Sequence, residues 1–259
     1  MFNLFRKLRQ GLLAEKRLTR YFLYAFGEIV LVVLGILIAL QINEWNEGHK
    51  RNLERMELYK AIQKDFITTK ALLAEGEKQG KRGIHRMESF LNAAGTNPGN
   101  FPIDSLKYWA GGAFDAPFVD PILTTYEEAI SSGRFSLITD ADLLEELAGF
   151  IREKEFYREH LTFTGEIFYY GSIYDLRRKV GSLGIIGGTQ YDRDYNRNLQ
   201  YSRHELTDDA FLELIKEPET YAAIENMLDA NYMIRDILRN MDSRLDGIVE
   251  KLEILTKDP

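Results

Sequence analysis

Apolar residues crowd into one stretch near the N-terminus and recur periodically in most of the remaining chain. Residues 21–42 read YFLYAFGEIVLVVLGILIALQI and contain one charged side chain, Glu28. As an α-helix this stretch rises roughly 33 Å, enough to cross a hydrocarbon core of about 30 Å. It is apolar on all sides over its outer two-thirds, whereas core helices of soluble domains are usually shorter and amphipathic. We therefore predict a transmembrane helix over residues 21–42.

A cleaved signal peptide is the competing interpretation of this stretch. Signal peptides have an apolar core of about 7–15 residues followed by small residues of the A-x-A type. The strictly apolar run Ile29–Leu40 has a suitable length, but Gln-Ile-Asn-Glu-Trp comes after it and apolar residues 21–26 precede it. We expect the segment to be retained as a signal anchor.

The charges on either side of the stretch predict its orientation. Residues 1–20 contain six basic side chains and one acid, and residues 43–60 contain four basic side chains. The positive-inside rule counts Lys and Arg and largely ignores acids. Residues 1–20 are thus predicted to be a basic, amphipathic cytoplasmic leader, and residues 43–259 a domain across the membrane. In a Gram-negative bacterium this domain is periplasmic and the membrane is the inner one.

Small residues recur within the predicted span. The pair Gly35-x-x-x-Ala39 has the spacing that lets a second helix approach closely. A lone helix that happens to contain small residues is the alternative. The predicted association face has a residue at every fourth position: Gly27, Leu31, Gly35, Ala39 and Asn43.

Glu28 is the one acidic or basic residue of the predicted span. A carboxylate inside the membrane is costly and usually faces a partner or water. Glu28 lies about 10 Å from the cytoplasmic edge of the span, so its side chain can reach the interface or take up a proton. The alternative is a site coupled to a proton or to a partner, including an oligomeric ion or solute pore with Glu28 in the path.

Beyond the span the pattern predicts further helices. The first is expected to continue unbroken through Leu73, with residues 84–91 as its continuation or a second short helix. Gly and Pro residues interrupt the pattern over Asn92–Pro121. Asp120 is predicted to cap a helix that has Pro121 in its first turn and ends at Gly133. A long helix is predicted over residues 141–179, capped by Thr139, with Phe156 or Tyr157 on its buried side.

Heptad spacing dominates the C-terminal region. Pro218 is predicted to start a helix whose apolar residues repeat at two heptad positions, and Thr207 to cap a short helix before it. Asn231 is the single polar member of the repeat. A buried amide at this position could fix the register or the oligomeric state of packed helices, or the side chain could face water at one end of an intramolecular bundle. The seam is compatible with an intramolecular bundle and with an intermolecular coiled coil. Its members are Ile224, Met227, Asn231, Ile234, Leu238, Met241, Leu245, Ile248, Leu252 and Leu255.

Charge and composition limit the chemistry. The chain has a net charge of −7 and no cysteine, and the leader contributes +5, so that the remaining residues carry −12. Such an acidic body disfavours nucleic-acid binding, and thiolate chemistry is excluded. The four histidines are scattered. The run 192–198 lacks the Gly and Glu of a calcium loop, and the Gly-rich run 181–188 lacks the context of a phosphate loop. We predict no catalytic residues, no metal and no cofactor.

Two segments resemble a known family. Residues 5–47, FRKLRQGLLAEKRLTRYFLYAFGEIVLVVLGILIALQINEWNE, are similar to the start of a family of single-pass membrane proteins of unknown function, common in Bacteroidota. Residues 124–150, TTYEEAISSGRFSLITDADLLEELAGF, are similar to the family's second shared stretch. The resemblance implies a membrane location and a helical extracytoplasmic region, and it brings no catalytic residues.

The sequence therefore predicts a mainly α-helical protein, in which one N-terminal transmembrane helix continues into an extracytoplasmic helical bundle with a long C-terminal heptad helix. The expected function is non-enzymatic: a module that forms homo-oligomers or holds a partner protein in the cell envelope. A periplasmic four-helix-type domain that senses a ligand is the first alternative, and the pore is the second. The expected partners are the lipid bilayer, further copies of the chain and an envelope protein.

Overall fold

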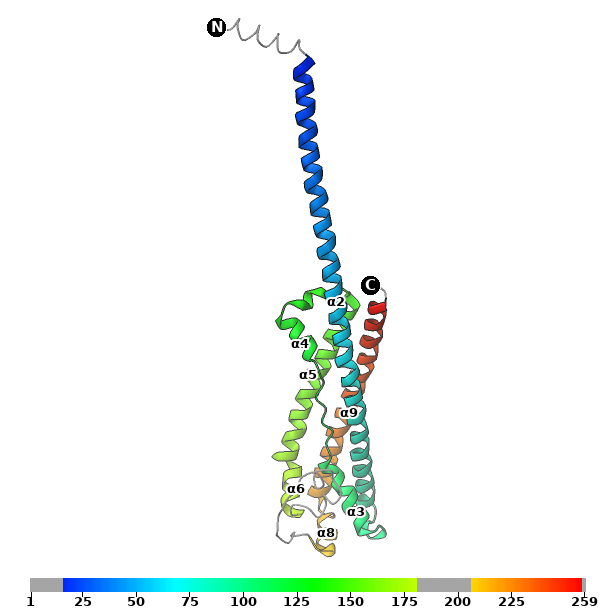
Figure 1. Cartoon of the computed structure of the whole chain (residues 1–259). Coiled ribbons are helices and arrows are strands. Elements are labelled where there is room, and N and C mark those ends of the chain that lie inside the picture. Colours follow the sequence, from blue (N-terminus) through cyan, green and yellow to red (C-terminus); the bar gives the residue numbers. More distant parts are fainter. Residues whose placement is uncertain (1–15, 181–205, 258–259) are drawn as a thin grey trace, which may run out of the picture. The chain divides into compact units, whose positions relative to one another are not determined.

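A computed structural model describes residues 16–180 and 206–257, the side chains of residues 16–21 and 24 excepted. The contacts divide the chain into two units, residues 1–56 and 57–259, which we describe separately. Every regular element in the described residues is a helix, which confirms the predicted fold class (Figure 1). The elements in chain order are α2 (Lys16–Gly95), α3 (Ile103–Ala110), α4 (Thr124–Ser131), α5 (Ala141–Tyr169), α6 (Ser172–Val180), α8 (Asp208–Leu214) and α9 (Pro218–Lys257).

Three sequence predictions lie outside the described residues. The leader helix falls mainly on residues 1–15, and the motifs at 181–188 and 192–198 fall on residues 181–205.

Three short 3₁₀ helices complete the described chain: η1 (Pro98–Asn100), η2 (Gly111–Phe114) and η3 (Arg134–Leu137).

Helix α2 is a single element that begins before the predicted span and ends at Gly95. The predicted continuation is thus confirmed, and residues 84–91 belong to the same helix. Within the second unit α2 is amphipathic. The apolar side chains Tyr59, Ile62, Phe66 and Leu73 are buried on one side, and charged residues occupy the other.

The second unit is built on lengthwise packing of α2, α5 and α9, which lie side by side in Figure 1. Helix α9 runs antiparallel to the other two, because successive residues of α9 contact progressively earlier residues of α2 and α5. The polar contacts that establish this direction are Glu77–Arg239 and Glu88–Tyr232 with α2, and Asp142–Lys251 and Glu146–Arg244 with α5.

The heptad seam of α9 is buried within the chain. Pro218 begins the helix and Thr207 caps α8 by accepting a hydrogen bond from the Ala210 N–H, both as predicted. Nine seam residues have at most 2% of their surface exposed, and Leu255 is partly exposed. The seam packs against α2 and α5 of the same molecule, so its apolar spacing is accounted for by an intramolecular bundle.

Asn231 lies where two apolar clusters of the second unit meet. One cluster contains Ile234 and the seam residues after it, and the other contains Met227, Ile224 and the end of α2. The Asn231 side chain is fully buried and donates a hydrogen bond to the Met227 carbonyl at 2.9 Å. The amide therefore bonds its own helix at the boundary between the clusters.

An extended segment, residues 115–123, crosses the glycine-containing side of α2. A Cβ at Gly76 would lie 2.2 Å from Val119, and one at Gly83 would lie 2.9 Å from the Asp115 carbonyl oxygen. No larger residue fits at these close approaches without movement of the segment. On the other side, the Val119 N–H donates a hydrogen bond to the Tyr157 hydroxyl at 2.9 Å.

The predicted start of the helix at Asp120-Pro121 is wrong. Helix α4 begins at Thr124, because the Thr69 hydroxyl accepts a hydrogen bond from the Ile122 N–H and donates one to its carbonyl, which holds this residue outside the helix. The Asp65 carboxylate accepts a hydrogen bond from the Thr125 N–H at 2.9 Å, so an acidic side chain of α2 bonds a backbone N–H in the first turn of α4. The predicted end is confirmed, since Gly133 has a left-handed φ of 78°.

The single helix predicted over residues 141–179 is also wrong. Helix α5 ends at Tyr169, Tyr170 has a φ of −133°, and α6 starts at Ser172. Gly171 forms the corner, where a Cβ would lie 3.0 Å from the Ile167 Cα. The N-cap of α5 is Asp140, which accepts a hydrogen bond from the Leu143 N–H at 2.7 Å, one residue after the predicted Thr139.

Candidate membrane and association surface

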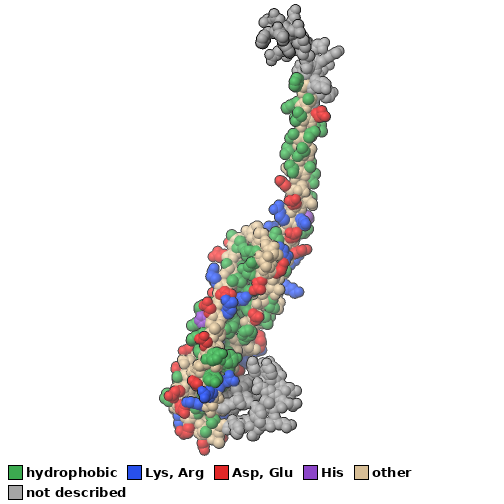
Figure 2. All heavy atoms as spheres, turned by 90° about the vertical axis from the view of Figure 1, so that its left-hand side faces the viewer, with side chains coloured by type: hydrophobic (Ala, Val, Ile, Leu, Met, Phe, Trp, Pro, Cys, Tyr) green, Lys and Arg blue, Asp and Glu red, His purple; other side chains and the backbone are tan. Residues whose placement is uncertain are grey.

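The predicted span is a continuous exposed apolar surface. Every described side chain from Phe22 to Ile42 is exposed, and hydrophobic side chains cover the visible face of this segment in Figure 2. Among the described helices, α2 is the one whose length and composition suit a membrane crossing. Its most apolar stretch of 18 residues has a mean hydropathy of 2.5, and none of that stretch is buried. The core helix of a soluble protein would be buried. A membrane anchor and a signal sequence both fit.

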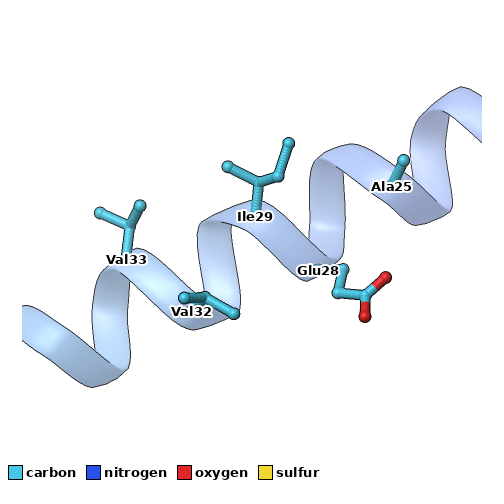
Figure 3. A pocket seen from close by; sticks show the side chains of 5 residues that line it. All are labelled: Ala25, Glu28, Ile29, Val32 and Val33. Carbon is cyan, nitrogen blue, oxygen red and sulfur yellow. The ribbon is translucent and has the colours of Figure 1, made fainter.

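Glu28 lines a shallow depression on this helix together with Ala25, Ile29, Val32 and Val33 (Figure 3). All five side chains come from neighbouring turns of α2, so the depression has a single helix as its wall. The other four are aliphatic, and within the described chain the Glu28 carboxylate has no ion pair or hydrogen bond with another side chain.

The predicted association positions form a diagonal ridge rather than a straight stripe. Each helical residue turns about 100°, so steps of four drift by about 40° and Gly27 and Asn43 point about 160° apart. Ridges of this kind interdigitate when two helices cross. A Cβ at Gly27 or Gly35 would meet no atom within 4 Å, whereas the Asn43 amide donates to Glu47 at 2.9 Å.

Arg86 is the one charged side chain buried in the described part of the chain. Its guanidinium donates to the Tyr108 carbonyl and to the Asp115 carboxylate, and it lies 4.2 Å from the centroid of the Tyr108 ring. Burial raises the pKa of Asp115, and the neighbouring Arg86 and Arg82 oppose this rise. These contacts join α2 to α3 and to the extended segment, so the buried pair serves packing.

Tyr157 is a second buried polar group with a structural role. Its hydroxyl accepts the Val119 N–H bond, and burial raises its pKa to about 12. The phenol therefore stays neutral at physiological pH. The sequence left Phe156 and Tyr157 as alternatives for the buried position, and the structure places Tyr157 inside and leaves Phe156 45% exposed.

A cavity of about 700 Å³ lies between α6 and the first turns of α9. Acidic and basic side chains both line it, among them Asp175, Arg178 and Glu219. Lys179 is bonded to the Glu217 carboxylate, which raises the lysine pKa. The Thr220 hydroxyl is buried and has no hydrogen-bond partner in the described residues. The sequence analysis missed this cavity, because no motif marks it.

An exposed aromatic row is formed by two residues of α5 and one just after its end. Phe156, Phe163 and Tyr170 recur every seven residues and are 45%, 57% and 85% exposed. Exposed apolar clusters of this kind often mark contact surfaces. The seven-residue spacing was the sequence signal that could have found the row.

The stretch Asn92–Pro121, where Gly and Pro interrupt the apolar pattern, also contains aromatic residues. Trp109 and Phe114 pack on the core, while Phe118 is 72% exposed.

In the described residues no group of three or more His, Asp or Glu side chains is placed to hold a metal ion. The described histidines are His49, His85 and His160, and the fourth, His204, lies outside the described residues. His49 stacks on Trp45. The His160 ring packs against the Phe156 ring at an angle of 59°, and its Nδ1 lies 2.9 Å from the Phe156 carbonyl oxygen. The absence of catalytic, metal and cofactor sites stays a prediction.

Comparison with known proteins adds one match. Residues 28–81 match the model of a family of unknown function (DUF6090). The matched residues lie wholly within α2 and start at Glu28, so they include part of the first segment that carried the sequence resemblance and none of the second. No curated protein and no solved structure matches the chain.

Proposed function

We propose that the protein is a membrane-anchored, non-enzymatic helical module that associates with further copies of itself or holds an envelope protein. Residues 21–42 span the bacterial inner membrane, the N-terminus is cytoplasmic and residues 43–259 are periplasmic. The observation that carries this proposal is the fully exposed apolar segment of α2, for which the described residues supply no cover.

Retention of the segment is supported by the residues on its C-terminal side. Helix α2 continues from the apolar segment to Gly95, and no A-x-A site interrupts it. The greater number of basic residues before the segment than after it favours a cytoplasmic N-terminus.

A role as a module is supported by how the polar groups of the second unit are used. Arg86 and Asp115 pair with each other, Tyr157 bonds the backbone of Val119, and ion pairs join α9 to both of its neighbours. The exposed aromatic row of Phe156, Phe163 and Tyr170 provides a surface on which an envelope protein can pack.

The cavity between α6 and α9 favours a second candidate function, the sensing of a small ligand. Its mixed lining of Asp175, Arg178 and Glu219 suits a polar molecule. Recovery of a small molecule bound to the purified protein would favour this function over the first.

Membrane anchoring is tested by placing two arginines in the span. Each arginine near the centre of a membrane helix costs about 2.5–3.5 kcal/mol, so Leu34→Arg with Leu37→Arg is expected to prevent stable insertion. Carbonate extraction of membranes measures the result: the wild type stays in the pellet and the variant is released. Leu53→Arg with Ile67→Arg, at exposed positions outside the span, is the matched control and stays in the pellet.

The orientation and the retention of the span are read in the same preparation. A periplasm-dependent reporter fused after Pro259 is expected to be active, and the mature chain is expected to retain residues 21–42. A wild-type chain released by carbonate, or one whose mature N-terminus lies beyond Trp45, would overturn the proposal.

A further inference from the structure

Within the described residues, the Glu28 carboxyl group has no hydrogen-bond or ion-pair partner. It is the one ionisable side chain described between residues 22 and 42, and its neighbours in Figure 3 are aliphatic. In hydrocarbon an unbonded polar group is costly, and intramembrane carboxyls usually pair. The amide of Asn43 lies about 20 Å further along the helix and is bonded to Glu47. None of the described side chains of α2 therefore pairs with Glu28, and a second helix can supply a partner.

The direction in which Glu28 projects identifies the face that the partner meets. Counting about 100° per residue, Gly35 lies about 20° to one side of Glu28 and Ala39 about 20° to the other. Gly27 lies about 100° away. The carboxyl group and the two small residues of Gly35-x-x-x-Ala39 therefore share one face, and space beside Gly35 is open.

We propose that two copies of the chain pack through the face formed by Glu28, Gly35 and Ala39, and that Glu28 hydrogen-bonds to the partner's Glu28. The proposal rests on the membrane anchoring proposed above. The small residues allow close approach of the two backbones. A neutral carboxyl group both donates and accepts hydrogen bonds, so two of them satisfy each other.

A second copy is the occupant that the geometry favours. Inserted in the same orientation, it brings an identical carboxyl group to the same depth and an identical small-residue face to the same contact. The Glu28 carboxyl group of that copy also lacks a hydrogen-bond partner, and the contact gives each of the two groups a partner. An unrelated partner would have to supply a donor at this depth independently.

The test measures association of the full chain in liposomes of phosphatidylethanolamine and phosphatidylglycerol. The chain has no cysteine, so Gly48→Cys, at an open position outside the span, gives one labelling site for donor and acceptor dyes. Energy transfer is followed as protein is diluted in lipid. Relative to this background, Glu28→Leu is expected to weaken association about three- to thirtyfold, the range of interhelical polar contacts in membranes.

Two matched pairs of variants make the test specific. Glu28→Gln keeps a group that donates and accepts, and it is expected to retain most of the association that Glu28→Leu loses. Gly35→Leu adds bulk on the proposed face and is expected to weaken association. Leu37→Phe adds bulk about 180° away from Glu28 and is expected to leave association unchanged.

Each other outcome overturns the pairing in a recognisable way. Equal association of wild type and Glu28→Leu would remove the carboxyl contact while leaving membrane anchoring intact. Equal losses in Glu28→Gln and Glu28→Leu would remove the pairing of like groups and indicate a cationic partner. Absence of energy transfer in the wild type at every density would remove self-association. Carbonate extraction of each variant scores failed anchoring separately.

Discussion

Helix α2 contains two stretches that differ in whether other described parts of the chain cover their apolar side chains. Every described side chain between residues 22 and 42 is exposed, although nearly all of them are apolar. Between residues 58 and 90 one side of the same helix is buried, with Ile62 and Met87 fully inaccessible, and charged residues occupy the other side. Both stretches form regular helix. The angular distribution of apolar residues therefore indicates whether the chain supplies its own cover or requires another environment.

The glycines of α2 repeat this contrast. Gly27, Gly35 and Gly48 have open space where a Cβ would lie, whereas Gly76 and Gly83 face atoms of the extended segment 115–123. A glycine in a helix costs about 1 kcal/mol relative to alanine. At Gly76 and Gly83 this cost is offset by close packing within the chain. At Gly35 no atom of the described residues lies within 4 Å of the position that a Cβ would take.

The largest expected effect comes from removing a core side chain in the covered stretch. Phe66 is 1% exposed and its ring centroid lies 5.4 Å from that of Phe150, so Phe66→Ala should lower the free energy of unfolding by about 3–5 kcal/mol. Urea unfolding in detergent, followed by circular dichroism, measures it. Leu34→Ala, at a position 51% exposed, should leave the unfolding of the second unit unchanged. Equal shifts in both variants would remove the contrast between the stretches.

An intermediate effect is expected where the extended segment approaches α2. In Gly76→Ala the new Cβ would lie 2.2 Å from Val119, and such overpacking costs about 1–3 kcal/mol against a helix-propensity gain of about 1 kcal/mol. The net result should be a loss of about 1 kcal/mol in the free energy of unfolding. Gly48→Ala meets no atom within 4 Å and should not lower it. An unfolding midpoint that rises in Gly76→Ala would contradict the close approach seen here.

The smallest effect concerns Asp242 on the polar side of the contact between α2 and α9. Burial raises the pKa of Asp242 above its ordinary value of 3.8; Lys70 opposes the rise, and Asp246 and Glu77 add to it. Because the folded state then binds the proton more tightly than the unfolded chain, this carboxyl favours folding below pH 3.8. The contribution is lost as the pH rises through the raised pKa.

At neutral pH the ionised Asp242 is therefore expected to destabilise the fold slightly. Asp242→Asn should raise the free energy of unfolding at pH 7 by less than about 1 kcal/mol and reduce its pH dependence above pH 3.8. Unfolding midpoints at several pH values measure this. Glu225→Gln, an exposed acid on the same helix, is the control. A lower midpoint for Asp242→Asn at pH 7 would contradict the assigned direction.

The helix starts show where sequence reasoning succeeds and where it fails. Thr207 and Pro218 were predicted correctly, because the groups that define these starts are neighbours in sequence. Asp120-Pro121 was not the start of α4, since Thr69 and Asp65 bond to residues more than fifty positions later. A contact of this kind leaves no local pattern. The cavity between α6 and α9 escaped prediction for the same reason.

By itself the sequence determined the helical class, the apolar span and the register of the α9 seam. These depend on the spacing of side chains along one helix, which the order of residues sets directly. Only the tertiary structure decided that the seam packs within the chain, that Tyr157 rather than Phe156 is buried, and that segment 115–123 lies against the glycines of α2. Those outcomes depend on which distant surfaces meet, and the free energy of that choice is shared among residues far apart in the chain.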